Sequence, residues 1–83
     1  MMHRLKIDPE YFSQNIADRK PWEYRRNDRN FRVGDFVRLS EFDRAQRAYT
    51  GRYSQHEIIY IYDVGNGYII MTLSSERESY NFQ

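Results

Sequence analysis

Apolar and polar side chains alternate with a two-residue period in several segments of this 83-residue chain. In Met2–Ile7 the alternation puts His3, Leu5 and Ile7 on one face. It recurs in Trp22–Arg26, Phe36–Phe42 and Arg52–Val64, and Tyr68–Leu73 is a further predicted strand that completes a hairpin. Eight Tyr and five Phe suit such half-buried strands, whereas Leu and Ala, with three of each, are too few for a helical bundle. The sequence therefore predicts a mainly β fold of about five strands.

A short helix is predicted between the first two strands. Asp8 can cap a helix, Pro9 suits its first position, and Glu10 favours its positive end. Phe12 and Ile16 lie about one turn apart and would form the buried face of a helix over about residues 9–17. The expected fold class is thus α+β, mainly β, with one N-terminal helix.

Turn-forming residues separate the predicted strands. Gly65–Gly67 predicts a tight hairpin, because Gly and Asn both tolerate positive φ. Val33–Asp35 predicts a second tight turn, and Asp43–Gly51 is interpreted as a polar connection. Many short strands joined in this way favour a small, partly closed β-barrel that binds ligands at its mouth.

We expect a single domain over residues 1–83, with its core in about 2–73. Residues 74–83 are polar and are interpreted as a tail or a late edge strand. Tyr60 and Tyr62 are interpreted as core residues, with a dimer face as the alternative. The oligomeric state is not predicted.

Several classes of site are excluded by residues that the sequence lacks. Without Cys there are no disulfides, thiolate metal sites or cysteine nucleophiles. His3 and His56 lie far apart in sequence and are interpreted as structural or exposed, so neither a metal nor a cofactor is predicted. Phosphate-binding glycine motifs and the hydrolase nucleophile motif do not occur.

No segment suggests a membrane or secretory destination. The longest apolar run, Ile58–Tyr62, is far shorter than the ~20 residues that cross a bilayer. The N-terminal residues lack the apolar stretch of a secretory signal. We therefore expect a cytoplasmic protein without a membrane partner.

Basic residues concentrate in the middle of the chain. Residues 19–52 hold ten Arg or Lys against five Asp or Glu, whereas residues 53–83 hold one against four. Arg outnumbers Lys eleven to two, and its planar group binds phosphates, carboxylates and base edges. This distribution fits a basic patch for a polyanion, and equally a solvated surface of ion pairs.

The segment 19–29 interleaves five cations with two aromatic residues and two carboxylates. On a strand, Glu23 and Arg25 would share one face and the two aromatic residues the other. Lys20 and Arg25 would hold the Glu23 carboxylate ionised and oriented, so that it accepts from an amide or an exocyclic amine. The alternative is an ion-pair ladder that orders a loop.

The spacing of several residue groups resembles that of one protein family. The groups are His3-x-Leu5-Lys6-Ile7, Tyr11-Phe12, Arg19-Lys20-x-x-Glu23-x-Arg25-x-Asn27-Asp28-Arg29-x-Phe31-x-Val33-Gly34-Asp35, Glu41-Phe42-Asp43 and Tyr49-Thr50-Gly51. Over about residues 2–73 they resemble the ASCH domains of the PUA-like superfamily, above all a short, uncharacterised branch found in bacteria, phages and prophages. The resemblance implies a small β-barrel with one or two helices at its mouth, and a role in binding RNA, nucleotides or modified bases.

One branch of ASCH proteins, similar in the same loop, hydrolyses acetylated cytidine through a Lys, a Thr nucleophile and an Arg. Lys20 and Arg25 match two of these positions, but Glu23 stands where the Thr should be. A carboxylate does not replace a hydroxyl nucleophile without a change of mechanism. The resemblance here implies only a water-based hydrolysis, with Glu23 as base and Lys20 stabilising an oxyanion.

The leading hypothesis is a small module that binds RNA or a nucleotide through the basic loop-strand segment at the barrel mouth. Its candidate contacts are Lys6, Lys20, Glu23, Arg25, Arg26, Asn27 and Arg29, with Trp22, Tyr24 and Tyr49 as stacking rings. The second hypothesis is an amidohydrolase for an acylated nucleoside, with Lys20 and Glu23 as its catalytic residues. The third is a protein-interaction factor of a phage or prophage that modulates a host protein.

Overall fold

The computed structural model of the protein describes residues 1–16, 21–74 and 78–80. Within these residues the chain forms six strands and one helix. They are β1 (Met2–Ile7), α1 (Pro9–Ile16), β2 (Trp22–Arg26), β3 (Phe36–Asp43), β4 (Ala48–Gly65), β5 (Tyr68–Leu73) and β6 (Glu78–Tyr80). The helix and the strands predicted from alternation all form, with small differences at their ends.

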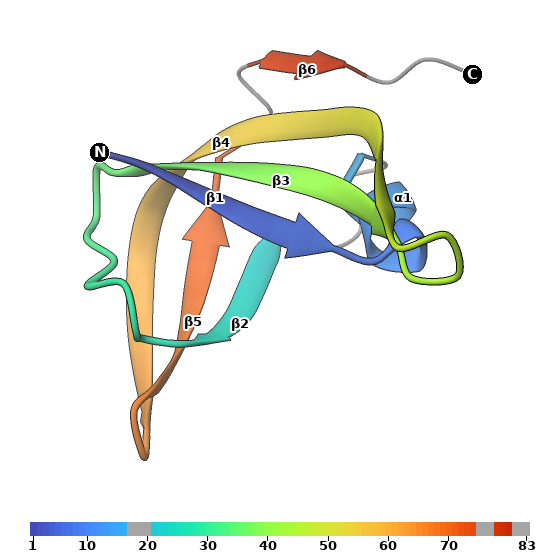
Figure 1. Cartoon of the computed structure of the whole chain (residues 1–83). Coiled ribbons are helices and arrows are strands. Elements are labelled where there is room, and N and C mark those ends of the chain that lie inside the picture. Colours follow the sequence, from blue (N-terminus) through green and yellow to red (C-terminus); the bar gives the residue numbers. More distant parts are fainter. Residues whose placement is uncertain (17–20, 75–77, 81–83) are drawn as a thin grey trace.

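The strands build one strongly bent sheet of order β1-β3-β4-β5-β2, and β6 pairs with β4 beside this path. β1 runs parallel to β3, whereas the other neighbouring pairs are antiparallel. The long strand β4 makes the bend, because its first half pairs with β3 and its second half with β5. Figure 1 shows β4 curving from the layer that contains β1 and β3 into the layer that contains β5 and β2.

The sheet is not closed into a barrel, so the expected partial barrel is corrected to an open, bent sheet. β1 and β2 stand at the two ends of the strand order, and the described residues show no main-chain pairing between them. Arg25 and Arg29 instead donate to the backbone carbonyls of Lys6 and Arg4 on β1. These two arginine side chains thus occupy carbonyl groups of β1 that would have to pair with β2 if the sheet closed into a barrel.

The core lies on the concave side of the bent sheet and is covered at one end by α1. β1 and β3 alternate between buried and more exposed positions, as their sequences predict, and β5 alternates in the same way although its sequence does not. The buried apolar residues are Leu5, Ile7, Phe12, Phe31, Val37, Leu39, Ile58, Ile69, Met71 and Leu73. This single cluster joins both halves of the sheet to the helix.

A buried polar cluster lies between α1 and β4. The Ser54 hydroxyl and the His56 ring both contact the Asn15 side chain, at 3.0 Å each. The His56 Nδ1 lies 2.9 Å from the carbonyl of Ser74, just after β5. These hydrogen bonds connect α1, β4 and the end of β5, and none of the three buried side chains faces solvent.

The connection between β3 and β4 is shorter than the sequence suggested. Asp43–Gly51 was expected to be a polar connection, but β4 begins at Ala48 and Tyr49 pairs with Phe42. The Asp43 carboxylate accepts from the backbone of the two residues at the tip of the turn, Ala45 and Gln46. This side-chain bonding lets a turn of few residues reverse the chain.

The expectation that Tyr60 and Tyr62 belong to the core is wrong. Both side chains lie on the outer face of β4 and are more than half exposed. Their partner positions on β5 are Thr72 and Ile70, which alternate with the buried Met71. The period of two therefore puts both tyrosines on the side opposite the core.

Among the residues that the structure describes, no helix is long and apolar enough to span a membrane.

Candidate functional site

A cleft of about 410 Å³ lies where the free edge of β1 approaches that of β2. Its walls come from the end of β1, the start of α1, the strand β2 and the turn between β3 and β4. The lining residues are Lys6, Ile7, Asp8, Tyr11, Trp22, Glu23, Tyr24, Arg25 and Arg44. The volume falls in the range of sites that hold a small ligand.

An ion pair of Glu23 and Arg25 lines the inner wall of the cleft. The alternation of β2 turns both residues toward the concave side, where their partners on β5 are Met71 and Ile69. The Arg25 Nε donates to the Glu23 carboxylate at 2.9 Å, and its Nη2 donates to the Lys6 carbonyl at 2.7 Å. Glu23 is only 4% exposed, so the guanidinium compensates a carboxylate that water hardly reaches.

Aromatic side chains form the rim of the cleft. Trp22 and Tyr24 point to the opposite side of β2 from Glu23, and both are about half exposed. Tyr11 adds a third ring from α1. A flat ring that enters the cleft thus meets aromatic faces at its entrance and a polar pair inside.

Two cations stand at the ends of the cleft. The Lys6 Nζ lies 4.3 Å from the centre of the Phe42 ring, which places a cation against an aromatic face. Arg44, in the turn after β3, donates to the Asp8 carboxylate at 2.8 Å. The backbone carbonyl of Asp8 accepts the first helical hydrogen bond, from the Phe12 N–H. Asp8 therefore both begins α1 and holds Arg44 in the wall of the cleft.

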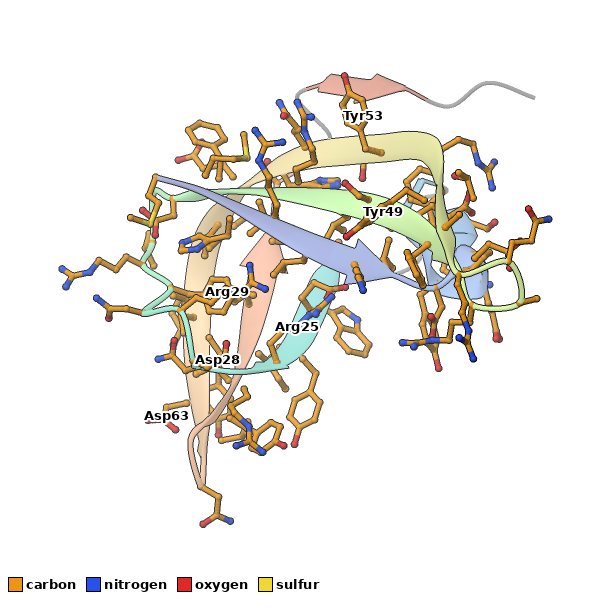
Figure 2. The ribbon with its side chains drawn as sticks, viewed as in Figure 1. Arg25, Asp28, Arg29, Tyr49, Tyr53 and Asp63 are labelled. Atoms are coloured by element: carbon orange, nitrogen blue, oxygen red, sulfur yellow. The ribbon has the colours of Figure 1, made fainter. Side chains whose placement is uncertain are left out.

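The structure brings half of the predicted binding residues together at this cleft. Lys6, Trp22, Glu23, Tyr24 and Arg25 line it, whereas Arg26, Asn27, Arg29 and Tyr49 lie outside its described lining. The tenth candidate, Lys20, falls outside the described residues. Figure 2 shows Arg25 and Arg29 between β1 and β2.

The candidates outside the lining make contacts within the fold. Asn27 accepts from the backbone of Phe31 at 3.1 Å and so orders the loop after β2. The hydrogen bond from Arg26 to the Tyr68 hydroxyl raises the pKa of the guanidinium above its usual value. Tyr49 packs edge-on against Phe42 at 5.1 Å between ring centres.

Sequence reasoning missed four lining residues, Ile7, Asp8, Tyr11 and Arg44. Asp8 was assigned only to the helix cap, and Arg44 comes from a turn that is distant in sequence. Tyr11 did carry a signal, because it adjoins Phe12 on a short helix and therefore lies off the buried face. No pattern in the sequence indicates that Arg44 meets Asp8.

The histidines have partners away from the cleft. The His3 Nε2 lies 2.8 Å from the Asp35 carboxylate, and this hydrogen bond lowers the pKa of Asp35. His56 belongs to the buried cluster described above. In the part of the chain that the structure describes, no three His, Cys, Asp or Glu side chains gather into a metal-binding group.

A second buried carboxylate, Glu41, lies on β3. Burial alone would raise its pKa, but hydrogen bonds from Arg52 and Thr50 outweigh that effect and lower the pKa below its usual value. The Arg52 Nε and the Thr50 hydroxyl each donate to Glu41 Oε1 at 2.7 Å. This pair ties β3 to β4 and does not line the cleft.

Comparison with known proteins assigns the chain to a family without a known activity. No curated protein matches the sequence. The pattern of a family described as a domain of unknown function, DUF3850, matches residues 2–73. This match covers both edges of the cleft and nearly all of the sheet, and the chain belongs to the DUF3850 family.

Proposed function

We propose that this protein binds a nucleotide, free or as part of RNA, in the cleft between β1 and β2. The observation that carries the proposal is the arrangement on β2, where a buried Glu23–Arg25 pair faces into the cleft and Trp22 and Tyr24 flank its entrance. Alternate residues of one short strand thus supply hydrogen-bonding groups and stacking surfaces.

The chemistry of the pair matches the edge of a nucleobase. A carboxylate accepts from exocyclic amines and ring N–H groups, whereas a guanidinium donates to carbonyl and ring nitrogen acceptors. Proteins that read unpaired bases combine such contacts with stacking on aromatic side chains. Glu23 and Arg25 would read the base edge while Trp22 or Tyr24 stacks on its face.

The cations at the ends of the cleft suit the phosphate. Lys6 is an exposed point charge in the cleft lining, and Arg44 is three-quarters exposed while its Nε binds Asp8. Contacts between such groups and phosphate release counterions, so binding should weaken as salt rises. The positive balance of residues 19–52 would favour the approach of the anion.

The resemblance to ASCH domains of the PUA-like superfamily supports the same proposal. PUA-like domains commonly bind RNA or modified bases, and the residues that carry the resemblance include Lys6, Glu23 and Arg25 of the cleft. This is an argument from analogy, because one fold serves many functions. The geometry of the cleft supports the proposal independently.

The two other hypotheses from the sequence stay predictions. Hydrolysis of an acylated nucleoside needs Lys20 beside Glu23, and Lys20 lies outside the described residues. A role as a protein-interaction factor has no contact in the structure that favours it over nucleotide binding.

The test is an NMR titration of ¹⁵N-labelled protein with nucleoside monophosphates and with a short single-stranded RNA, at low and moderate salt. We expect shifts on Trp22–Arg25 and the end of β1 that weaken at the higher salt. Stronger binding of the RNA than of any monophosphate would identify RNA as the ligand. A spectrum that no nucleotide or RNA changes would contradict the proposal.

The carboxylate at the centre of the proposal has a matched control. Glu23→Gln keeps the size of the side chain but removes the charge and half of the acceptor capacity, so binding should fall about tenfold or more. Glu10→Gln removes a charge from the exposed face of α1, outside the cleft lining, and should leave the affinity unchanged. Equal affinities of the two variants would argue against base recognition by Glu23.

A further inference from the structure

The outer face of the half-sheet β2–β5–β4 carries aromatic side chains in register. On β5, Ile69 and Met71 are buried and point to the core. Because side chains alternate along a strand, Ile70 and Thr72 point outward. The pairing of the three strands then forms two neighbouring outward rows, Tyr60–Thr72–Trp22 and Tyr62–Ile70–Tyr24. These six residues are called the outer aromatic face.

The rings of this face are accessible. Trp22 is 44% exposed, Tyr24 53%, Tyr60 59% and Tyr62 57%. Tyr24 stacks nearly parallel on Tyr68, the next outward residue of β5, at 5.3 Å between ring centres. Solvated clusters of large aromatic side chains commonly mark an interaction site on a soluble protein.

The charge around the face favours an anionic occupant. Arg26 extends the outward side of β2 by one position, and its guanidinium lies 5.4 Å from the Tyr68 ring. The acidic residues Glu23 and Asp63 of these strand segments point to the opposite side of the sheet. Their pairing partners on β5 are Met71 and Ile69, and these two partners are buried in the core. The six residues of the described face carry no carboxylate, and Arg26 adds a cation beside them that also interacts with the Asp28 carboxylate.

The size of the face argues against a second copy of the chain. Three strands ~4.8 Å apart and two rows ~7 Å apart give a backbone footprint of roughly 10 by 7 Å. A standard protein interface involves about 20–30 residues on each partner, several times the six residues of this face. Two or three stacked bases match it, since sheets with exposed aromatic residues hold that number in RNA-binding domains.

The face is continuous with the cleft. Trp22 and Tyr24 are shared, because they line the cleft entrance and also end the two rows on β2. A strand of nucleotides that leaves the cleft over β2 would therefore meet Ile70 and Thr72, and then Tyr60 and Tyr62. The strand pairing is continuous from Trp22 and Tyr24 through β5 to Tyr60 and Tyr62.

We infer that the outer aromatic face stacks the unpaired bases of a single-stranded nucleic acid whose neighbouring nucleotide occupies the cleft. The inference rests on the proposed function for the entry of the strand into the cleft. Stacking on Tyr60 and Tyr62, which do not line the cleft, is a separate source of affinity. It makes a strand of several nucleotides a better ligand than a mononucleotide.

The experiment compares two probes on three variants of the full chain. The probes are AMP and a fluorescein-labelled single-stranded RNA of about six nucleotides, a length within the range of such sites. Tyr60→Ala and Tyr62→Ala remove rings of the face, whereas Phe36→Ala removes an exposed ring of β3 that lies outside the face and the cleft lining. Thermal unfolding first checks that all three variants fold.

We expect Tyr60→Ala and Tyr62→Ala each to weaken RNA binding about tenfold, the usual scale for one lost base stack, and to leave AMP binding unchanged. Phe36→Ala should change neither. A duplex of the same sequence should bind more weakly than the single strand, because its bases are already stacked.

Three results would overturn the inference: no binding of the RNA, the same RNA affinity in all three variants, or a dimer in sedimentation that Tyr62→Ala dissociates without an effect on RNA. The proposed function fails in a different way. RNA binding that depends on Tyr60 and Tyr62 but not on Glu23, with no AMP binding, would support stacking on the face and reject the cleft as a nucleotide site.

Discussion

The guanidinium of Arg25 on β2 donates a hydrogen bond to the backbone carbonyl of Lys6 on β1, at 2.7 Å, and so links the two free edges of the sheet. The same guanidinium pairs with the buried Glu23 carboxylate. One side chain thus fixes the width of the cleft and the orientation of the carboxylate inside it. This double role predicts that stability and ligand binding respond together when Arg25 changes.

Arg25→Ala should lower the free energy of unfolding by about 2 kcal/mol, because it leaves a buried carboxylate without its partner. Urea denaturation measures the change. Arg25→Ala should cost less free energy of unfolding when it is made in the Glu23→Gln variant than in the unchanged protein, because the Glu23 charge is then already absent. Losses that simply add would show that the two side chains do not interact. The exposed pair Arg44–Asp8 is the control, and Arg44→Ala should cost less than about 0.5 kcal/mol.

Arg29→Ala should expose the edge of β1. The Arg29 Nη1 donates to the Arg4 carbonyl at 2.8 Å, and an ordinary hydrogen bond of this kind contributes about 1 kcal/mol. We expect faster amide exchange in β1 and a similar loss of unfolding free energy. Arg32→Ala removes another exposed cation from the same loop and should have little effect. Identical exchange rates in the two variants would contradict the edge-covering role.

The stability of the fold should fall in acid through Glu41 and Asp35. The pKa of each carboxyl lies below its usual value of 4.5 or 3.8, owing to Arg52 and Thr50 for Glu41 and to His3 for Asp35. A lowered pKa stabilises the folded state above the usual pKa, and this contribution is lost as pH falls through the folded value. Unfolding free energy should therefore decline below about pH 4.5. Glu41→Gln should be less stable at neutral pH and should lose less on acidification, which denaturation at several pH values would show.

Lys6→Ala should weaken nucleotide and RNA binding and make it less dependent on salt. Loss of one phosphate contact to a single strand reduces the slope of log affinity against log salt by about 0.7. Fluorescence titrations at a series of salt concentrations measure the slope. Arg47→Ala is the control, because Arg47 is exposed in the β3–β4 turn but does not line the cleft. An unchanged slope in Lys6→Ala would exclude Lys6 from phosphate binding.

Local patterns in the sequence were sufficient to predict most of the secondary structure. Alternation located β1 and β2 within their observed bounds, the Gly65–Gly67 turn located β5, and Asp8 with Pro9 located the start of α1. The Gly65–Gly67 hairpin formed with positive φ at Asn66 and Gly67. These features depend on neighbours in the chain, so short-range rules describe them well.

The assignment of faces was less certain where apolar residues run together. In Ile58–Tyr62 every residue is apolar or Tyr, so alternation alone does not decide which side faces the core. A register shift between Ile58 and Tyr60 settles it by turning Ile61 inward and Tyr60 outward. The outer aromatic face thus followed from strand pairing and was hidden from the sequence.

By itself, the sequence determined the order of the elements, which residues share a face of β1, β2 and β3, and the juxtaposition of Glu23 with Arg25. The shared faces follow from the two-residue period of a strand. Only the tertiary structure decided that β1 pairs with β3, that the sheet stays open, and that Arg44 meets Asp8. The physical reason is the bend in β4, which brings distant segments together through long-range pairing. Its position depends on register shifts that no local pattern encodes.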